Sequence, residues 1–261
     1  MEHKVAYLGL TSPFGIAHRG GANENLENTI SAFNHSVNLG YSVLETDLQL
    51  TADGELVISH DDRLLRNFGL RGAISGLKYS ELATLAQRNG DPILRFVDFL
   101  DWLPNYVRVN LDPKTDRVVE PIIRFLAQRE DLWYRVCIGS FETKRLRKIR
   151  HELPQVSTSL GATEVRDLVF AHKTGRAPNL PSNVIAVQAP EKAYGLKFVN
   201  RSFIDFVHDL GLDIHIWTVD SAPDMHRLYD NGIDAVMTDQ PSVLKAVLVE
   251  RGHWRENNGD F

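Results

Sequence analysis

The chain has 261 residues, of which 43% are hydrophobic and 24% are charged, and its formal net charge is −5 at pH 7. These values are typical of a globular protein that can bury a substantial core, and the negative charge gives no reason to expect binding to nucleic acid. No apolar run approaches the roughly 18 residues that span a bilayer, so we expect no stable membrane insertion.

The N-terminal segment "MEHKVAYLGLTSPFG" lacks a long apolar stretch and a small-residue cleavage site, which argues against a secretory signal. The only cysteine, Cys137, excludes an intrachain disulfide. Its place in the apolar run "RVCIGSF" favours a buried strand thiol over a nucleophile. We therefore expect a cytoplasmic protein.

Short apolar segments alternate with longer helical patterns along the whole chain, and no linker interrupts them, so we expect one domain over residues 1–261. The expected strands are residues 15–19, 42–50, 107–112, 135–141, 156–160, 184–188, 213–219 and 234–239. Eight strands with helices between them, in a chain of this length, predict a closed (β/α)8 TIM barrel of the α/β class. The alternative is an open doubly wound sheet, which would ordinarily carry a glycine-rich nucleotide turn that is not found.

The expected helices begin with "ENTISAFNHSVNLG", in which Ile30, Phe33 and Val37 have helical spacing and Gly40 is a plausible C-terminal cap. Residues 119–130, 141–153, 201–211 and 222–232 show the same pattern. Within the second of these segments, a basic cluster is predicted to form a solvated helix face: Lys144, Arg145, Arg147, Lys148 and Arg150.

The stretch "LETDLQLTADGELVISHD", residues 44–61, indicates a β-hairpin after the second barrel strand. A parallel crossover needs a dozen or more residues, and only "TADG" separates the two halves. If Asp53 and Gly54 form a two-residue turn, the register pairs Asp47 with His60.

Two strands carry polar residues on the face that would point into the barrel. In the strand 42–50, Glu45 and Asp47 share a face with Val43 and Gln49, and the other face is leucine-rich. Buried carboxylates are costly unless they are paired or bind a cation.

In the strand 107–112, Arg108, Asn110 and Asp112 lie opposite three apolar residues, and Lys114 follows. Glu45, Asp47 and Asp112 together suit one hard divalent cation, Mg²⁺ or Ca²⁺. Ion pairing or exposure is the alternative for each carboxylate.

The end of the first strand reads "AHRGGANENLENT". Arg19 suits a phosphate, and the two glycines after it let backbone approach a ligand closely. His18 and His60, at strand ends beside a cation site, form a plausible general acid–base pair. We expect His215, which lies beside Trp217 in the sequence, to serve in packing.

In order, "IAHRGG", "ENTISAF", "LETDLQLTADGELVISHD" and "GIDAVMTDQP" cover residues 16 to about 244. This ordered set resembles the glycerophosphodiester phosphodiesterase family, which belongs to the phospholipase-C-like phosphodiesterases. The resemblance implies a TIM barrel with one bound divalent cation, commonly Mg²⁺ or Ca²⁺. It also implies hydrolysis of small-molecule glycerophosphodiesters to glycerol 3-phosphate and an alcohol. The absence of a long insertion after His60 is similar to the compact intracellular form of the family.

The resemblance also assigns roles. It makes His18 and His60 the acid–base pair, with a cyclic phosphate formed by the substrate's own glycerol hydroxyl and then opened by water. The metal ligands would be Glu45, Asp47 and Asp112, and the substrate contacts would be Arg19, Lys114, Glu27 and Trp217.

Three residues depart from the family pattern. Leu26 stands where proline is usual, Asp112 where glutamate is common, and Asp220 where asparagine is usual. The shorter Asp112 could bind a metal through water. The extra negative charge of Asp220 could change the preference among head groups.

Two other functions stay open. One is a phospholipase-D-like enzyme that acts on lysophospholipids or sphingolipids, which would need an apolar groove at the barrel mouth. The expected rim, residues 61–75 and 189–199, is not strongly hydrophobic. The other is a non-catalytic barrel that binds a phosphorylated metabolite. A binding role would not require both histidines and all three carboxylates.

Overall fold

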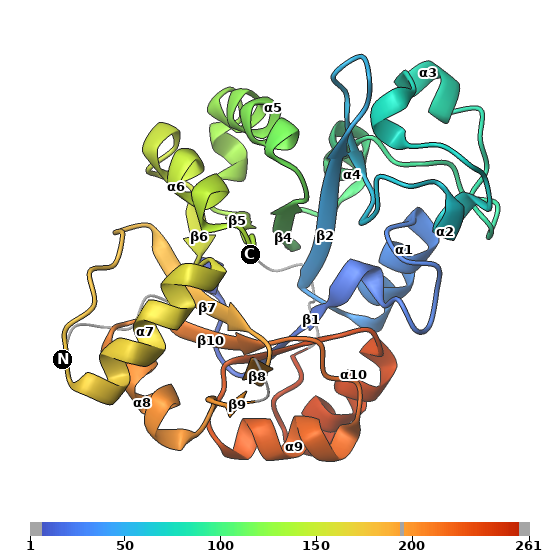
Figure 1. The fold of residues 1–261 in the computed structure, drawn as a ribbon. Coiled ribbons are helices and arrows are strands. Elements are labelled where there is room, and N and C mark those ends of the chain that lie inside the picture. Colours follow the sequence, from blue (N-terminus) through green and yellow to red (C-terminus); the bar gives the residue numbers. More distant parts are fainter. Residues whose placement is uncertain (1–6, 194–195, 256–261) are drawn as a thin grey trace.

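Eight parallel strands form a closed barrel in the computed structural model, which describes residues 7–193 and 196–255 (Figure 1). The barrel strands are β1 (Phe14–Ala17), β2 (Val43–Leu50), β4 (Arg108–Pro113), β5 (Val136–Ile138), β6 (Ser157–Ser159), β7 (Val184–Ala189), β10 (Asp213–Ile216) and β11 (Ala235–Thr238). Each lies beside the next in chain order, and β1 pairs with both β11 and β2, which closes the ring. The expected (β/α)8 barrel is confirmed.

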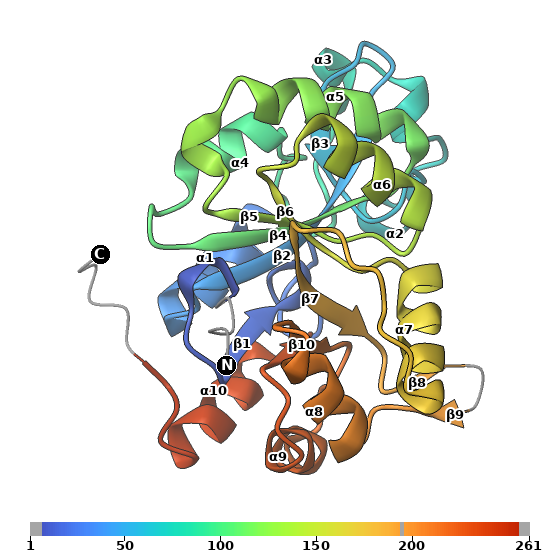
Figure 2. The same ribbon diagram turned by 90° about the vertical axis from the view of Figure 1, so that its left-hand side faces the viewer.

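Helices surround the barrel on its outside (Figures 1 and 2). The longer ones are α1 (Ile30–Leu39), α4 (Phe96–Trp102), α5 (Asp116–Ala127), α6 (Thr143–Glu152), α7 (Ala162–Thr174), α8 (Arg201–Asp209), α9 (Ala222–Asp230) and α10 (Pro241–Glu250). Two single-turn helices, α2 (Leu65–Phe68) and α3 (Tyr79–Leu82), lie in the long β3–β4 connection, and β8 (Lys192–Ala193) pairs with β9 (Leu196–Lys197). The predicted limits of α1 hold because the Thr29 side chain accepts a hydrogen bond from the Ala32 amide and Gly40 ends the helix.

Two apolar layers fix which face of each strand points inward. Leu44 and Leu48 of β2, with Val109 of β4, join the large core between barrel and helices. Val43 and Cys137 join the smaller core inside the barrel. Alternation along β2 therefore sends Glu45 and Asp47 inward, as the sequence predicts, and the buried strand thiol is confirmed.

The hairpin forms, but its predicted register is wrong by one residue. β3 (Leu56–Ile58) runs antiparallel to β2, and Leu48 pairs with Ile58. The loop holds three residues, because the backbone amide of Thr51 donates to the Glu55 carbonyl and the Thr51 hydroxyl donates to Asp53. Asp47 consequently faces Ser59, and His60 lies one residue beyond the pairing.

The basic cluster on α6 is only partly solvated. Lys144, Arg147 and Lys148 are exposed as predicted, whereas Arg150 is buried. The Arg150 guanidinium donates to both Glu164 carboxylate oxygens, to the Thr158 hydroxyl and to the Ser159 carbonyl. These partners come from β6 and α7, so the helix sequence alone does not reveal them.

We expect Arg150→Met to lower the free energy of unfolding by about 3 kcal/mol, because the substitution leaves the Glu164 carboxylate without its buried partner. Denaturant unfolding followed by circular dichroism measures the change. Arg147→Met is the matched control on the same helix, and its 68% exposed side chain predicts a change within about 0.5 kcal/mol. Equal losses in the two variants would contradict the structural role of Arg150.

Candidate active site

The chain makes a tight turn where β1 ends, and this turn positions Arg19. Arg19, Gly20 and Gly21 all have positive φ (52°, 77° and 99°). A Cβ on Gly20 would lie 2.9 Å from α1, and one on Gly21 would lie 2.6 Å from Pro241 of α10. The sequence predicts that these glycines let a ligand approach the backbone. In the structure, they let α1 and α10 pack closely against it. The turn also lets the backbone amide of Arg19 donate to Glu45.

His18 is held between two carboxylates. Its Nδ1 lies 2.6 Å from Oδ1 of Asp239, and its Nε2 lies 3.7 Å from Oε2 of Glu45. Burial by itself would lower the pKa of His18, but the negative charges of Glu45 and Asp239 outweigh it, so the pKa is raised.

No function was predicted for Asp239 from the sequence, although it stands in the quoted motif "GIDAVMTDQP". The available signal is its place directly after the last barrel strand, where site residues of such barrels gather. Asp220 supports the same loop by accepting hydrogen bonds from the Asp239 amide and the Thr238 hydroxyl. An effect of Asp220 on head-group preference stays a prediction.

Glu45 and Asp47 are buried side by side along β2. Burial, together with the charge of Asp47, raises the pKa of Glu45 to about 8. Burial also acts to raise the pKa of Asp47, but the cations Lys114 and Arg19 outweigh it, and the pKa is lowered. The buried Asn28 amide donates to Asp47 at 2.8 Å.

The register between β2 and β4 places Asp47 beside Asp112. Lys114 Nζ lies 3.0 Å from Asp112 Oδ2 and 3.3 Å from Asp47 Oδ1. Burial raises the pKa of Asp112, while these two carboxylates raise the pKa of Lys114 against the effect of burial. The fold thus gathers the expected carboxylates and Lys114 on neighbouring strands.

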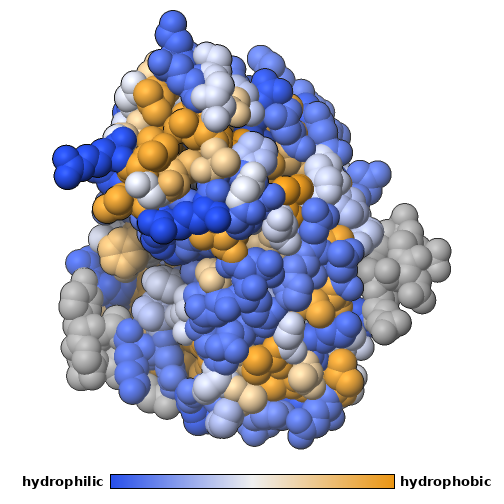
Figure 3. Space-filling view, turned by 90° about the vertical axis from the view of Figure 1, so that its right-hand side faces the viewer, coloured by the Kyte–Doolittle hydropathy of each residue, from blue (hydrophilic) through white to orange (hydrophobic). Residues whose placement is uncertain are grey.

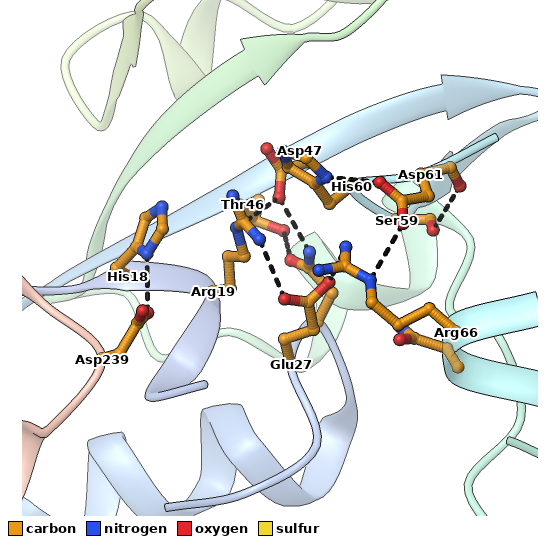
Figure 4. A network of polar contacts seen from close by, with 12 residues as sticks. His18, Arg19, Glu27, Thr46, Asp47, Ser59, His60, Asp61, Arg66 and Asp239 are labelled. Atoms are coloured by element: carbon orange, nitrogen blue, oxygen red, sulfur yellow. Dashed lines mark hydrogen bonds and ion pairs between the residues drawn. The ribbon is translucent and has the colours of Figure 1, made fainter. Parts of the chain in front are cut away.

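Arg19 and Glu27 join this cluster through ion pairs (Figure 4). Arg19 Nη1 lies 2.9 Å from Glu27 Oε2, and Arg19 Nε lies 3.3 Å from Asp47 Oδ2. Arg66 of α2 completes the network with contacts of 2.5 Å to Glu27 and 2.9 Å to Asp61. Arg66 was not anticipated, because only the folding of the β3–β4 connection brings it to Glu27.

His60 mirrors the arrangement around His18. Its Nδ1 lies 2.7 Å from Oδ1 of Asp61, and its side chain is 28% exposed. In both imidazoles Nδ1 is therefore engaged by a carboxylate at hydrogen-bond distance. The charge of His60 is one of the smaller causes that lower the pKa of Asp47.

Trp217, the remaining predicted substrate contact, packs against the small apolar core inside the barrel. It follows β10 and lines a pocket together with Glu191, Asp220 and Asp224. Within the described part of the chain, no hydrogen bond or ion pair joins its side chain to the cluster. The neighbouring His215 is fully buried and packs edge-on against Phe14, so its predicted packing role is confirmed.

The three carboxylates fit a metal ion in their chemistry but not in their present positions. Within residues 7–193 and 196–255, no three His, Cys, Asp or Glu side chains are placed so that they could hold a metal ion as they stand. Lys114 lies between Asp47 and Asp112 instead. The donor chemistry nevertheless fits a hard divalent cation, since all donors are oxygens. Burial is the main cause of the raised pKa values of Glu45 and Asp112, and the negative charge of Asp47 adds to it.

A parallel barrel with histidines and carboxylates gathered at the ends of its strands has the arrangement of a TIM-barrel enzyme. The family model described as "Glycerophosphoryl diester phosphodiesterase family" matches residues 18–243, and the chain belongs to this family.

Curated relatives agree with this membership, and solved structures share the fold. A protein of Mycobacterium tuberculosis named "Probable glycerophosphodiester phosphodiesterase 2" is 32% identical, and the match covers 96% of each chain. A lysophospholipase D of Homo sapiens is 28% identical over 89% of this chain and 85% of its own.

A glycerophosphodiester phosphodiesterase structure from Agrobacterium tumefaciens has a TM-score of 0.74 at 18% identity and covers 91% of this chain and 99% of its own. An Oleispira antarctica phosphodiesterase, solved with the product sn-glycerol-3-phosphate, has a TM-score of 0.73 at 21% identity and covers 91% of this chain and 97% of its own.

No helix among the described residues is both long and apolar enough to cross a bilayer.

Proposed function

We propose that this protein hydrolyses glycerophosphodiesters to glycerol 3-phosphate and an alcohol. The observation that carries the proposal is the pair of histidines, each with Nδ1 on a carboxylate, beside a cluster of buried carboxylates and cations. The name of the relative from Mycobacterium tuberculosis and the product bound to the Oleispira antarctica enzyme support the same substrate class. We also propose that the chain acts as one catalytic domain, and a cytoplasmic location stays the prediction from sequence.

The reaction begins when a glycerol hydroxyl of the substrate attacks phosphorus. One histidine takes the hydroxyl proton as the new P–O bond forms, and the other donates a proton to the alcohol as its bond to phosphorus breaks. Water then opens the resulting cyclic phosphate with the two histidine roles reversed. Arg19 and Lys114 offset the charge on the phosphoryl oxygens.

Glu45, Asp47 and Asp112 would hold one divalent cation, Mg²⁺ or Ca²⁺, which when bound supplies positive charge to the phosphoryl oxygens. Lys114 now neutralises two of these carboxylates. With a cation held by Asp47 and Asp112, Lys114 would no longer be needed to neutralise them and would be available to contact the phosphate.

The test is a coupled assay for glycerol 3-phosphate release from glycerophosphocholine and glycerophosphoethanolamine, run with Mg²⁺, with Ca²⁺ and with EDTA. We expect release that EDTA abolishes and that one of the two cations restores. Release that is unchanged in EDTA would overturn the metal assignment. No release from folded, cation-supplied protein would overturn the proposed reaction.

An assay for choline release from lysophosphatidylcholine and from glycerophosphocholine separates the lysophospholipase alternative. Human, rat and mouse relatives carry the name lysophospholipase D. Turnover of lysophosphatidylcholine without turnover of glycerophosphocholine would favour that activity. Tight binding of glycerol 3-phosphate with no turnover of either substrate would favour the non-catalytic barrel.

A further inference from the structure

Residues 61–75, here called the rim segment, follow His60 directly and form a compact loop. The amide of Leu64 donates to the Gly72 carbonyl, and the amide of Ile74 donates to the Asp62 carbonyl. Leu64, Phe68 and Ile74 point inward and pack in a small apolar core of their own. The loop therefore has a fixed inner face, which determines the side chains on its outer face.

The outer face carries leucines and arginines together. Leu65 is 61% exposed and Leu70 is 42% exposed, and Arg63 and Arg71 are exposed near them in the same loop. Among the described residues, no carboxylate lies within ion-pair distance of either of these arginines. Arg88 lies across the loop, where its guanidinium donates to the carbonyls of Leu65 and Arg66.

Figure 3 views the side of the molecule that carries α1 and α2. Apolar side chains gather in the upper part of this face, and strongly hydrophilic side chains project beside them. Exposed apolar groups occur elsewhere as well, for example at Phe170 on α7. The rim segment differs because two exposed leucines lie within the nine positions 63–71, which also hold two arginines, Arg63 and Arg71, that have no ion pair with any described residue.

The position of this face relative to the active site is fixed by two contacts. Arg66 ties the rim segment to Glu27 and Asp61, and Asp61 in turn holds His60 (Figure 4). A surface that engaged the outer face would therefore lie beside the histidines.

We propose that Arg63, Leu65, Leu70, Arg71 and Arg88, the rim surface, dock the protein onto an anionic phospholipid bilayer. Leucine side chains lower the free energy of binding when they enter the acyl boundary, and arginines lower it by pairing with anionic head groups. The positive charge that complements such a bilayer is confined to the rim surface. The chain as a whole is negative, and without these arginines the bilayer would repel it. Docking brings the barrel mouth to the membrane without any insertion of a helix.

The test is co-sedimentation of the full chain with vesicles of phosphatidylcholine alone, or with about 30% phosphatidylglycerol, at low and high salt. We expect binding to the anionic vesicles only, weakened by salt. Each charge near the surface contributes roughly fivefold, so Arg63→Gln/Arg71→Gln should lower the partition coefficient by at least about tenfold. Leu65→Ser/Leu70→Ser should lower it by a similar factor.

Phe170→Ser/Arg176→Gln is the matched control, since Arg176 lies over the exposed Phe170 ring on another helix. It should leave binding unchanged. Equal binding to both kinds of vesicle, no binding by the wild type, or full binding by both rim variants would each overturn the proposal. Binding is measured without turnover, and the rim variants should keep their activity on soluble glycerophosphocholine, so failure of docking is distinguishable from failure of the proposed hydrolysis.

Discussion

His60→Ala is expected to lower kcat for glycerophosphodiester hydrolysis by about 10²–10⁴-fold, the usual contribution of a positioned acid or base. His60 is partly exposed and lies just beyond β3, so its removal leaves the barrel core intact. The measurement is kcat at saturating substrate, together with thermal unfolding of the variant.

His151→Ala is the control, because His151 is 83% exposed on α6 and, among the described residues, forms an ion pair with Glu152 alone. It should leave both kcat and unfolding unchanged. Near-normal kcat in the His60 variant would remove His60 from the proposed mechanism, whereas a lower unfolding temperature alone would show a structural role.

Asp239→Asn is expected to lower kcat by roughly 10²-fold with little change in KM. The Asp239 carboxylate lies 2.6 Å from Nδ1 of His18, where it fixes the ring and stabilises its protonated form. Asparagine has the same size but no charge, and its amide can present a donor where His18 also presents one. Steady-state kinetics on glycerophosphocholine separate the two parameters.

Asp220→Asn provides the comparison within the same loop. Asp220 supports the Asp239 amide rather than His18, and an asparagine oxygen can accept the same bonds. We expect its kcat to stay within about threefold of the wild type, as for a substitution away from the reacting groups. If both variants lost activity equally, the effect would belong to the loop and not to the charge beside His18.

The sequence predicted the fold well because each barrel strand is a short apolar segment between helical patterns. The strand limits were less accurate. The predicted strand 135–141 ends at Ile138, since Gly139, Ser140 and Phe141 belong to the loop that leads to α6. The hairpin register depended on one unknown, the number of loop residues, and a side-chain contact between Thr51 and Asp53 decided it.

The site was predictable where its residues share a motif or a strand end, and the carboxylates of β2 and β4 meet as expected. Asp239 and Arg66 were not predicted as site residues, and the reason is physical. Their partners are brought to them by tertiary folding, and His18 and Asp239 are 221 positions apart in the chain. Arg150 was wrongly predicted to be solvated for the same reason. Its partner Glu164 lies on α7, a helix that is not among those predicted from the sequence.

The closure of the barrel between β1 and β11 has a consequence for biosynthesis. His18 lies near the start of the chain, and its partner Asp239 follows the last strand. A ribosome-bound chain that lacks β11 therefore has every residue of the β2 and β4 cluster but no complete His18 pair. If His18 and Asp239 act together as proposed, a chain in which β11 has not yet joined the barrel is expected to be inert toward the substrate.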